Sequence, residues 1–204
     1  MTYFTRHGPR CPGAVVLAAG DSRRMGRHKA LLSTPKGTFL DVWVARLRAA
    51  GIMKICVVLG RNRAAVEARL DLPAGMVVEN RSPEEGMLSS FLAGLEHLPG
   101  DLPGVFLCPV DHPEVLVTTL VKLKSRLAPG KIVVPVHRGR RGHPVLFAAE
   151  LLGELRRAPA NQGARAVVRA VPARVIECPA GPGVLRDVDT PADYRRFMAA
   201  VPRT

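Results

Sequence analysis

The chain has 204 residues and a formal net charge of +13, and 47% of its residues are hydrophobic. This length allows one sizeable core, and no apolar run approaches the roughly 20 residues of a membrane span. The charge calls for negatively charged ligands, but 4% aromatic residues and the lack of a long basic block or a nucleic-acid-binding motif disfavour RNA. Small polyphosphate ligands satisfy the charge equally well.

Residues 1–12 are polar and basic and have no apolar signal region, so we predict a flexible N-terminal tail before a single domain over residues 13–204. The four cysteines stand far apart without a Cys-x-x-Cys pair, which favours reduced thiols in a cytoplasmic protein. The histidines lack metal-ligand spacing, so we do not expect a zinc site.

Apolar runs typical of strands alternate with segments of helical period. A buried strand is predicted over residues 13–19, followed by a helix whose apolar face includes Leu40, Trp43 and Leu47 and which ends at Gly51. Because parallel neighbours need crossover connections, the alternation predicts an α/β fold with a mainly parallel central sheet and helices on both faces. The further elements expected are strands over 55–59, 76–79, 105–108 and 131–136, and helices over 64–70, 88–95 and 116–127.

The pattern changes after His137. Residues 138–144 read R-G-R-R-G-H-P, a basic glycine-rich loop. Thr190 and Asp193 form a predicted capping box, with Pro191 as the first residue of the closing helix. The elements expected between them are a strand over 145–147, helices over 148–157 and 162–170, and a strand over 173–178.

The loop after the first predicted strand combines glycine with cationic side chains. Val15 to Leu32 reads V-V-L-A-A-G-D-S-R-R-M-G-R-H-K-A-L-L. Gly20 lets backbone N–H groups approach a phosphate, and Arg23, Arg24 and Lys29 supply cationic donors. The spacing G-x5-G-x2-K matches neither the P-loop nor the dinucleotide fingerprint. We therefore expect a different phosphate-binding loop, the alternative being a basic turn with solvated arginines.

A carboxylate follows the strand predicted over 105–108. Asp111 stands in C-P-V-D-H-P, at the sheet edge where ligands bind in parallel α/β folds and where the Gly20 loop also lies. A hard cation such as Mg²⁺ prefers oxygen ligands that it shares with substrate phosphates. The alternative is that Asp111 caps a helix beginning near Pro113. The residues alone leave both interpretations open.

The string L-A-A-G-x-S-x-R-M-G-x-x-K-x-L-L resembles the signature loop of nucleotidyltransferases with a Rossmann-like three-layer fold, most closely the molybdenum cofactor cytidylyltransferases and their relatives. The resemblance extends from about residue 13 to residue 197, with four motifs in order. It implies catalytic roles for Arg24, Lys29 and Asp111. It implies nucleotide binding by Leu17, Ala18, Ala19, Gly20, Arg24 and Lys29.

Two acidic motifs resemble the metal site of the same family. P-x-D-x-P at Asp111 resembles its metal-binding aspartate, and D-V-D-T-P-x-D over 187–193 resembles its C-terminal segment. The resemblance implies that Asp111 and Asp189 hold Mg²⁺, and that Asp187 is either a supporting partner or solvated. These roles require the two distant carboxylates to converge opposite the Gly20 turn.

The stretch N-x5-G-x3-S resembles the segment that meets the base and ribose. It implies nucleotide binding by Asn80, Gly86, Ser89 and Ser90, although a turn with an ordinary helix start explains either serine as well.

The stretch G-x-x-G-H-P resembles the acceptor segment of the cytidylyl branch. It implies acceptor binding by Arg141, Gly142 and His143, the alternative for His143 being a histidine held by a turn before Pro144.

The resemblance implies transfer of CMP from CTP to a phosphorylated acceptor, molybdopterin carrying its metal, with release of pyrophosphate. It favours CTP over GTP, because a single glycine, Gly20, follows Ala19 and no extra residue precedes Lys29. Arg140 and Arg141 depart from the pattern expected of the acceptor loop, which leaves another phosphorylated small molecule open as the acceptor. A guanylyltransferase or a sugar-phosphate nucleotidyltransferase is the alternative within the fold. A non-catalytic nucleotide- or cofactor-binding chaperone is the alternative outside it. A molybdoenzyme or cofactor chaperone is the implied protein partner, with neither nucleic acid nor membrane.

Overall fold

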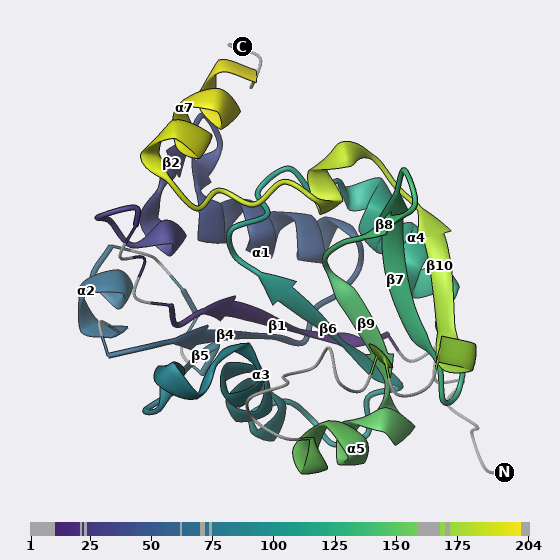
Figure 1. Ribbon diagram of the computed structural model, residues 1–204. Helices are drawn as coiled ribbons and strands as arrows, with labels where there is room; N and C mark the ends of the chain where they lie inside the picture. The colour runs from purple at the N-terminus through teal and green to yellow at the C-terminus, as the bar shows by residue number, and fades with distance from the viewer. Residues whose placement is uncertain are drawn as a thin grey trace, which may run out of the picture.

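The computed structural model describes residues 11–20, 22, 24–61, 63–69, 72–73, 75–158, 168–169 and 172–200. Its strands form a central sheet in the order β10-β7-β9-β6-β1-β4-β5, with β8 paired to β7 (Figure 1). The strands are β1 (Gly13–Ala18), β4 (Ile55–Leu59), β5 (Val77–Glu79), β6 (Gly104–Pro109), β7 (Ile132–His137), β8 (Arg140–Arg141), β9 (Val145–Ala148) and β10 (Val175–Pro179).

Parallel pairing dominates the sheet, as predicted. β1 pairs in parallel with β4 and β6, β4 with β5, and β7 with β10. The exceptions are β9, which runs antiparallel between β6 and β7, and the short β8, which is antiparallel to β7. All residues of β1, β4 and β6 are buried, which explains why their sequences are continuous apolar runs and not alternating ones.

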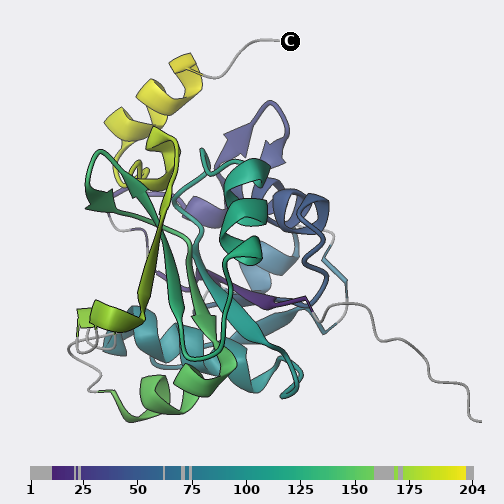
Figure 2. The ribbon, with the colours of Figure 1, turned by 90° about the vertical axis from the view of Figure 1, so that its right-hand side faces the viewer.

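Helices cover both faces of the sheet (Figure 2). Ala14 and Val16 of β1 face the core shared with α1 and α4, whereas Val15 and Leu17 face the core shared with α3 and α5. α7 continues the first core, where Phe197 packs edge-on against Phe39 of α1. The helices are α1 (Phe39–Ala49), α2 (Arg63–Glu67), α3 (Met87–Glu96), α4 (Val117–Ser125), α5 (Leu152–Arg157) and α7 (Pro191–Ala200).

Short elements are where sequence patterns failed. A two-stranded hairpin, β2 (Ser33–Thr34) with β3 (Gly37–Thr38), was not predicted because strands of two residues show no periodicity. Thr38 ends this hairpin and also caps α1, in a capping box with Asp41. Short 3-10 turns also lie at Lys29–Leu31, Pro83–Glu85, Ala149–Leu151, Pro172–Arg174 and Pro182–Val184.

Three predicted elements need correction. Arg140–Arg141 forms β8 and not a loop, because it pairs with the end of β7. Leu116 does not join the buried stripe of α4; it precedes that helix and is 56% exposed. The helix predicted over 148–157 is helical only from Leu152, after the 3-10 turn. Most of the helix predicted over 162–170, and residues 1–10 of the predicted tail, lie outside the described residues.

Buried thiols lie in the sheet, at Cys56, Cys108 and Cys178, and none of these cysteines forms a disulfide. Burial raises the pKa of the Cys56 thiol to about 12, so this side chain behaves as a small apolar residue. Among the described residues, no helix combines the length and apolarity needed to cross a bilayer.

Gly94 allows α3 to lie directly on the sheet, because a Cβ there would stand 2.4 Å from Cγ1 of Val15 and 2.9 Å from Cγ2 of Val58. We expect Gly94→Ala to lower the free energy of unfolding by about 1–3 kcal/mol through overpacking, despite the better helix propensity of alanine. Gly153→Ala in α5 is the matched control, since its Cβ would meet no atom nearer than 3.9 Å. Urea denaturation measures both variants, and a fully stable Gly94→Ala protein would contradict this packing.

Candidate active site

Backbone hydrogen bonds bring two loops together beyond the carboxyl ends of β1 and β6. The Val188 N–H donates to the Asp111 carbonyl over 2.9 Å, and the Val110 N–H donates to the Leu17 carbonyl over 3.0 Å. The Asp189 N–H donates to the Asp193 carboxylate over 3.2 Å. These bonds therefore bring the residues Asp111 and Asp189 together, although 78 positions separate them in the chain.

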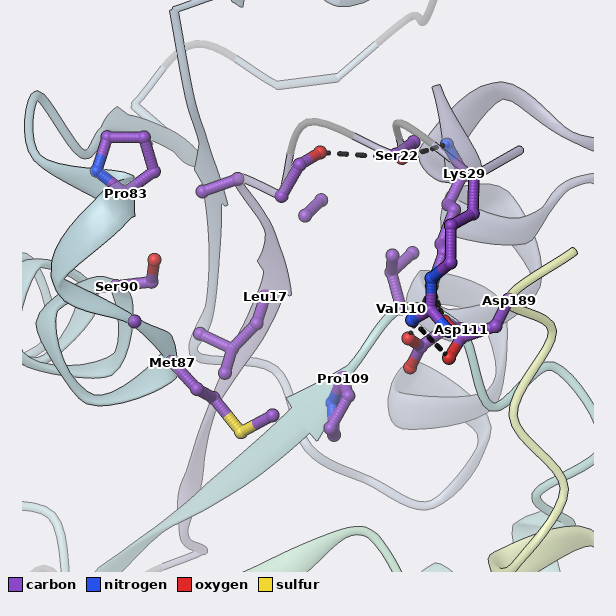
Figure 3. A pocket seen from close by; sticks show the side chains of 15 residues that line it. Leu17, Ser22, Lys29, Pro83, Met87, Ser90, Pro109, Val110, Asp111 and Asp189 are labelled. Carbon is purple, nitrogen blue, oxygen red and sulfur yellow. Dashed lines mark hydrogen bonds and ion pairs between the residues drawn. The ribbon is translucent and has the colours of Figure 1, made fainter. Parts of the chain in front are cut away.

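One ammonium group lies between these carboxylates (Figure 3). The Lys29 Nζ donates to Asp111 Oδ2 over 2.9 Å and also to Asp189 Oδ1. Arg24 donates to the other oxygen of Asp189 over 2.8 Å. The structure thus brings together the four charged side chains to which the sequence motifs assign catalysis and metal binding.

The ion pairs outweigh the cost of burial at this cluster. Burial of Lys29 favours its neutral form, but Asp111 and Asp189 together raise the pKa of the ammonium above its ordinary value. Burial likewise disfavours the charged Asp189, yet Lys29 and Arg24 lower the pKa of its carboxyl. Lys29 and Asp189 are therefore both charged at neutral pH.

A cleft of about 320 Å³ opens beside this cluster. Figure 3 shows Lys29, Asp111 and Asp189 on one side of it and Pro83, Met87 and Ser90 on the other. The predicted residues that line it are Leu17, Ala18, Ala19, Gly20, Arg24, Lys29, Gly86, Ser90, Asp111 and Asp189. The lining residues that sequence analysis missed are Ser22, Pro83, Met87, Pro109 and Val110.

Ser22 carries a signal that the motif already contained. It stands in the G-x-S step of the loop, and its hydroxyl accepts the Lys29 N–H over 3.1 Å. It adopts a φ of 50°, which is rare for serine. Ser22 therefore helps to set where the Lys29 side chain begins.

Asn80 and Ser89 support the opposite wall but do not line the cleft. The buried Asn80 amide donates to the hydroxyls of Ser89 and Ser90 over 2.9 Å each, and its carbonyl oxygen accepts the Ser82 N–H. Gly86 has a φ of 98°, in the left-handed region that favours glycine, and a Cβ there would meet no atom within 4 Å. Glycine is therefore favoured at position 86 by its backbone conformation, because there is room for a side chain.

The predicted acceptor residues lie outside the cleft lining. Arg141 forms an ion pair with Glu177 of β10 over 2.7 Å. Gly142 lies so close to the chain that a Cβ would stand 2.2 Å from the Val184 carbonyl oxygen. The His143 ring packs against that of His112, the neighbour of Asp111, with ring centroids 5.1 Å apart.

His112 is a further residue near the site that sequence analysis missed, because it was considered only as a zinc ligand. Its ring is buried, and its Nε2 atom lies 3.8 Å from Asp111 Oδ1. Burial lowers the pKa of His112 despite the nearby carboxylates of Asp111 and Asp187, so the ring is neutral at neutral pH. Asp187 itself is exposed.

The carboxylate pair suits a hard divalent cation. Asp111 Oδ1 is buried and has no hydrogen-bond partner, so one ligand oxygen is available. Within the described ranges, no three His, Cys, Asp or Glu side chains gather as a metal site, so a cation here needs further oxygen ligands from phosphate or water. The alternative role for Asp111 is wrong, because α4 begins at Val117 and Leu116 occupies its N-cap position.

Comparison with known proteins defines the class. Residues 14–175 match the model of the MobA-like NTP transferase domain, so the chain belongs to this family and is a nucleotidyltransferase. The family indicated by the sequence motifs and the predicted fold class are both confirmed.

Among curated proteins, the chain is 32% identical to the nicotine blue oxidoreductase of Paenarthrobacter nicotinovorans, over 92% of this chain and 97% of that one. It is 26% identical to the molybdenum cofactor cytidylyltransferase of Escherichia coli K12, over 88% and 92%. Among solved structures, Rv0371c of Mycobacterium tuberculosis H37Rv superposes with a TM-score of 0.85 at 31% identity, over 95% and 100%. Its manganese complex superposes with a TM-score of 0.75 at 29% identity, over 94% and 100%.

The capping box before α7, predicted at Thr190 and Asp193, is confirmed and gives a pH dependence. The hydroxyl and N–H of Thr190 donate to the Asp193 carboxylate over 2.6 and 2.8 Å, and these bonds lower its pKa from 3.8 to about 2. A carboxyl whose pKa is lower in the folded state stabilises the protein above its unfolded pKa, and this contribution is lost as pH falls through the folded pKa.

We therefore expect Asp193→Ala to be less stable than wild type at neutral pH, with the difference closing as pH falls from 3.8 to about 2. Denaturant titrations across this range measure the effect. Asp187→Ala, an exposed aspartate in the same segment, is the control. A difference for Asp193→Ala that does not change with pH would contradict the assigned hydrogen bonds.

Proposed function

We propose that this nucleotidyltransferase transfers CMP from CTP to the phosphate of a small acceptor, molybdopterin carrying its metal being the first candidate, and releases pyrophosphate. The observation that carries the proposal is the convergence of Lys29, Asp111 and Asp189 at the mouth of a cleft bordered by the Gly20 loop. The molybdenum cofactor cytidylyltransferase among the relatives supports the choice of substrates. Reduced, buried thiols support a cytoplasmic location.

The two sides of the cleft suit different parts of a nucleotide. The Gly20 backbone, Arg24 and Lys29 would compensate the charge of the triphosphate. Across the cleft, Gly86 and Ser90 would meet the base and ribose. The Asn80 amide donates to the Ser90 hydroxyl and holds it in place, and Ser89, which accepts from the same amide, donates to the Ser82 carbonyl. Leu17, Ala18 and Ala19 would form the floor between them.

Asp111 and Asp189 are the residues that would hold a divalent cation, Mg²⁺ being our choice. Such a cation supplies positive charge to the phosphate oxygens at which the bond changes occur. The manganese complex of Rv0371c supports a divalent-cation site in this class of structure.

The acceptor needs little activation from the protein. A phosphate monoester has a second pKa of about 6, so it is mostly dianionic at neutral pH and attacks without a general base. Catalysis then rests on positioning and on charge compensation by Lys29 and Arg24. Among the proposed acceptor residues, His143 packs against His112 and Gly142 lies against Val184, and Arg141 would exchange its ion pair with Glu177 for the acceptor phosphate.

The decisive experiment incubates the protein with Mg²⁺, one nucleoside triphosphate and molybdopterin with or without molybdenum, and measures pyrophosphate. We expect release with CTP to exceed release with GTP, because the first loop has a single glycine, Gly20, after Ala19, as in the cytidylyl branch that it resembles. Faster release with GTP would make the protein a guanylyltransferase. Tight CTP binding without pyrophosphate from any acceptor, sugar phosphates included, would identify a non-catalytic binding protein.

Asp111→Asn should lower pyrophosphate release at least about 100-fold, the scale for removing one group that stabilises transition-state charge. Thermal unfolding checks that the variant folds. Asp187→Asn is the matched control, since this aspartate is exposed and does not line the cleft. Near-normal turnover by Asp111→Asn would remove Asp111 from the catalytic machinery.

A second candidate function follows from the Paenarthrobacter relative, whose printed name is that of an oxidoreductase and whose similarity covers 92% of this chain. The same preparation tests it, with nicotine blue and a reduced nicotinamide nucleotide in place of CTP and acceptor. Loss of the nicotinamide absorbance together with no pyrophosphate from any acceptor would favour this second function.

A further inference from the structure

The Lys29 ammonium lies where two carboxylates meet. Its side chain is 16% exposed, and Nζ forms ion pairs with Asp111 Oδ2, at 2.9 Å, and with Asp189 Oδ1. Building on the proposed function, we propose that this ammonium occupies the position of the divalent cation between Asp111 and Asp189 in the ligand-free protein, so that metal binding requires Lys29 to leave. Lys29 would then compete with the metal for the two carboxylates, in addition to its proposed role as a phosphate ligand.

The backbone segments that carry the two carboxylates are held side by side. The Val188–Asp111 backbone hydrogen bond and the bond from the Asp189 N–H to Asp193 hold both loops in place. Two like charges held this close need a compensating charge, or one of them takes up a proton. Lys29 supplies that charge to both, and Arg24 supplies a second one to Asp189.

A cation held by both aspartates would need carboxylate oxygens that Lys29 and Arg24 contact. Lys29 takes Asp111 Oδ2 and Asp189 Oδ1, and Arg24 takes Asp189 Oδ2. Asp111 Oδ1 is the carboxylate oxygen of the pair left without a hydrogen bond, and it is buried. A divalent cation that binds without nucleotide therefore has only Asp111 Oδ1 available among the four carboxylate oxygens, and the Lys29 ammonium repels it.

The Lys29 ammonium has an alternative position beside the Gly20 loop, where a triphosphate would bind. Lys29 carries its charge on a flexible stem, and its backbone N–H is held by Ser22 in the loop that contains Gly20. Gly20 has open space where a side chain would be, on the same cleft. A triphosphate bound against Gly20 offers Lys29 new anionic partners, and by linkage the nucleotide and the metal then strengthen each other's binding equally.

The test is binding of Mn²⁺ alone, followed through the electron paramagnetic resonance signal of free Mn²⁺. If Lys29 leaves the carboxylates about 10% of the time, the apparent Kd of the wild type is about tenfold above the intrinsic value. We therefore expect Lys29→Met to bind Mn²⁺ about tenfold more tightly than wild type. Lys29→Gln should show the same gain, and it serves if the methionine variant does not fold.

Arg24→Met is the matched control, because it also removes one positive charge from the cluster. Arg24 is 71% exposed and contacts Asp189 without bridging to Asp111, so we expect a much smaller gain. Equal gains in Arg24→Met and Lys29→Met, or no gain in either Lys29 variant, would overturn the proposal. Adding Asp111→Asn to Lys29→Met should remove the gain, and a gain that persists would also overturn it.

These results separate the inference from the proposed function. Pyrophosphate release from CTP by the wild type, without tighter Mn²⁺ binding in the Lys29 variants, would refute only the competition between ammonium and metal. Tighter Mn²⁺ binding in those variants, without pyrophosphate release by the wild type, would refute only the nucleotidyl transfer to the proposed acceptor.

Discussion

The site depends on one backbone hydrogen bond, from the Val188 N–H to the Asp111 carbonyl. It joins the loop after β6, which carries Asp111, to the segment before α7, which carries Asp189. The two aspartates therefore lie on adjacent backbone segments. Because the bond is between main-chain atoms, the two backbone segments lie side by side whatever rotamers their side chains adopt. Two carboxylates this close favour a compensating cation, and Lys29 supplies one.

Close backbone contacts hold the segment that precedes Val188. Gly183 lies against the Glu114 carbonyl, where a Cβ would be 2.4 Å from the oxygen, and the His143 N–H donates to the Val184 carbonyl over 2.9 Å. The glycine-rich loop before β9 and the loop after β6 thus enclose this segment from two sides. Gly142 and Gly183 permit an approach that a side chain would prevent, which gives the G-H-P motif a structural role beside its proposed role in acceptor binding.

The fold class was predictable because buried parallel strands leave a strong local signal. β1, β4 and β6 are apolar throughout, and the helices between them carry apolar faces of helical period. The antiparallel β9 was predicted as a strand, but its direction was not, since a run of four buried residues does not encode its partner. The β2–β3 hairpin was missed because each of its strands has two residues, too few to show alternation of apolar and polar side chains.

The sequence by itself determined the parts of the site that are local in the chain: the glycine turn with its cationic side chains, the aspartates after β6 and before α7, and the capping box at Thr190. Only the tertiary structure decided how they combine. It placed Lys29 between Asp111 and Asp189, and it turned Asn80 toward the serines and away from the cleft. The reason is physical, because motif spacing fixes which groups are near in the chain, whereas pairing of distant charges depends on backbone contacts formed only when the sheet is assembled.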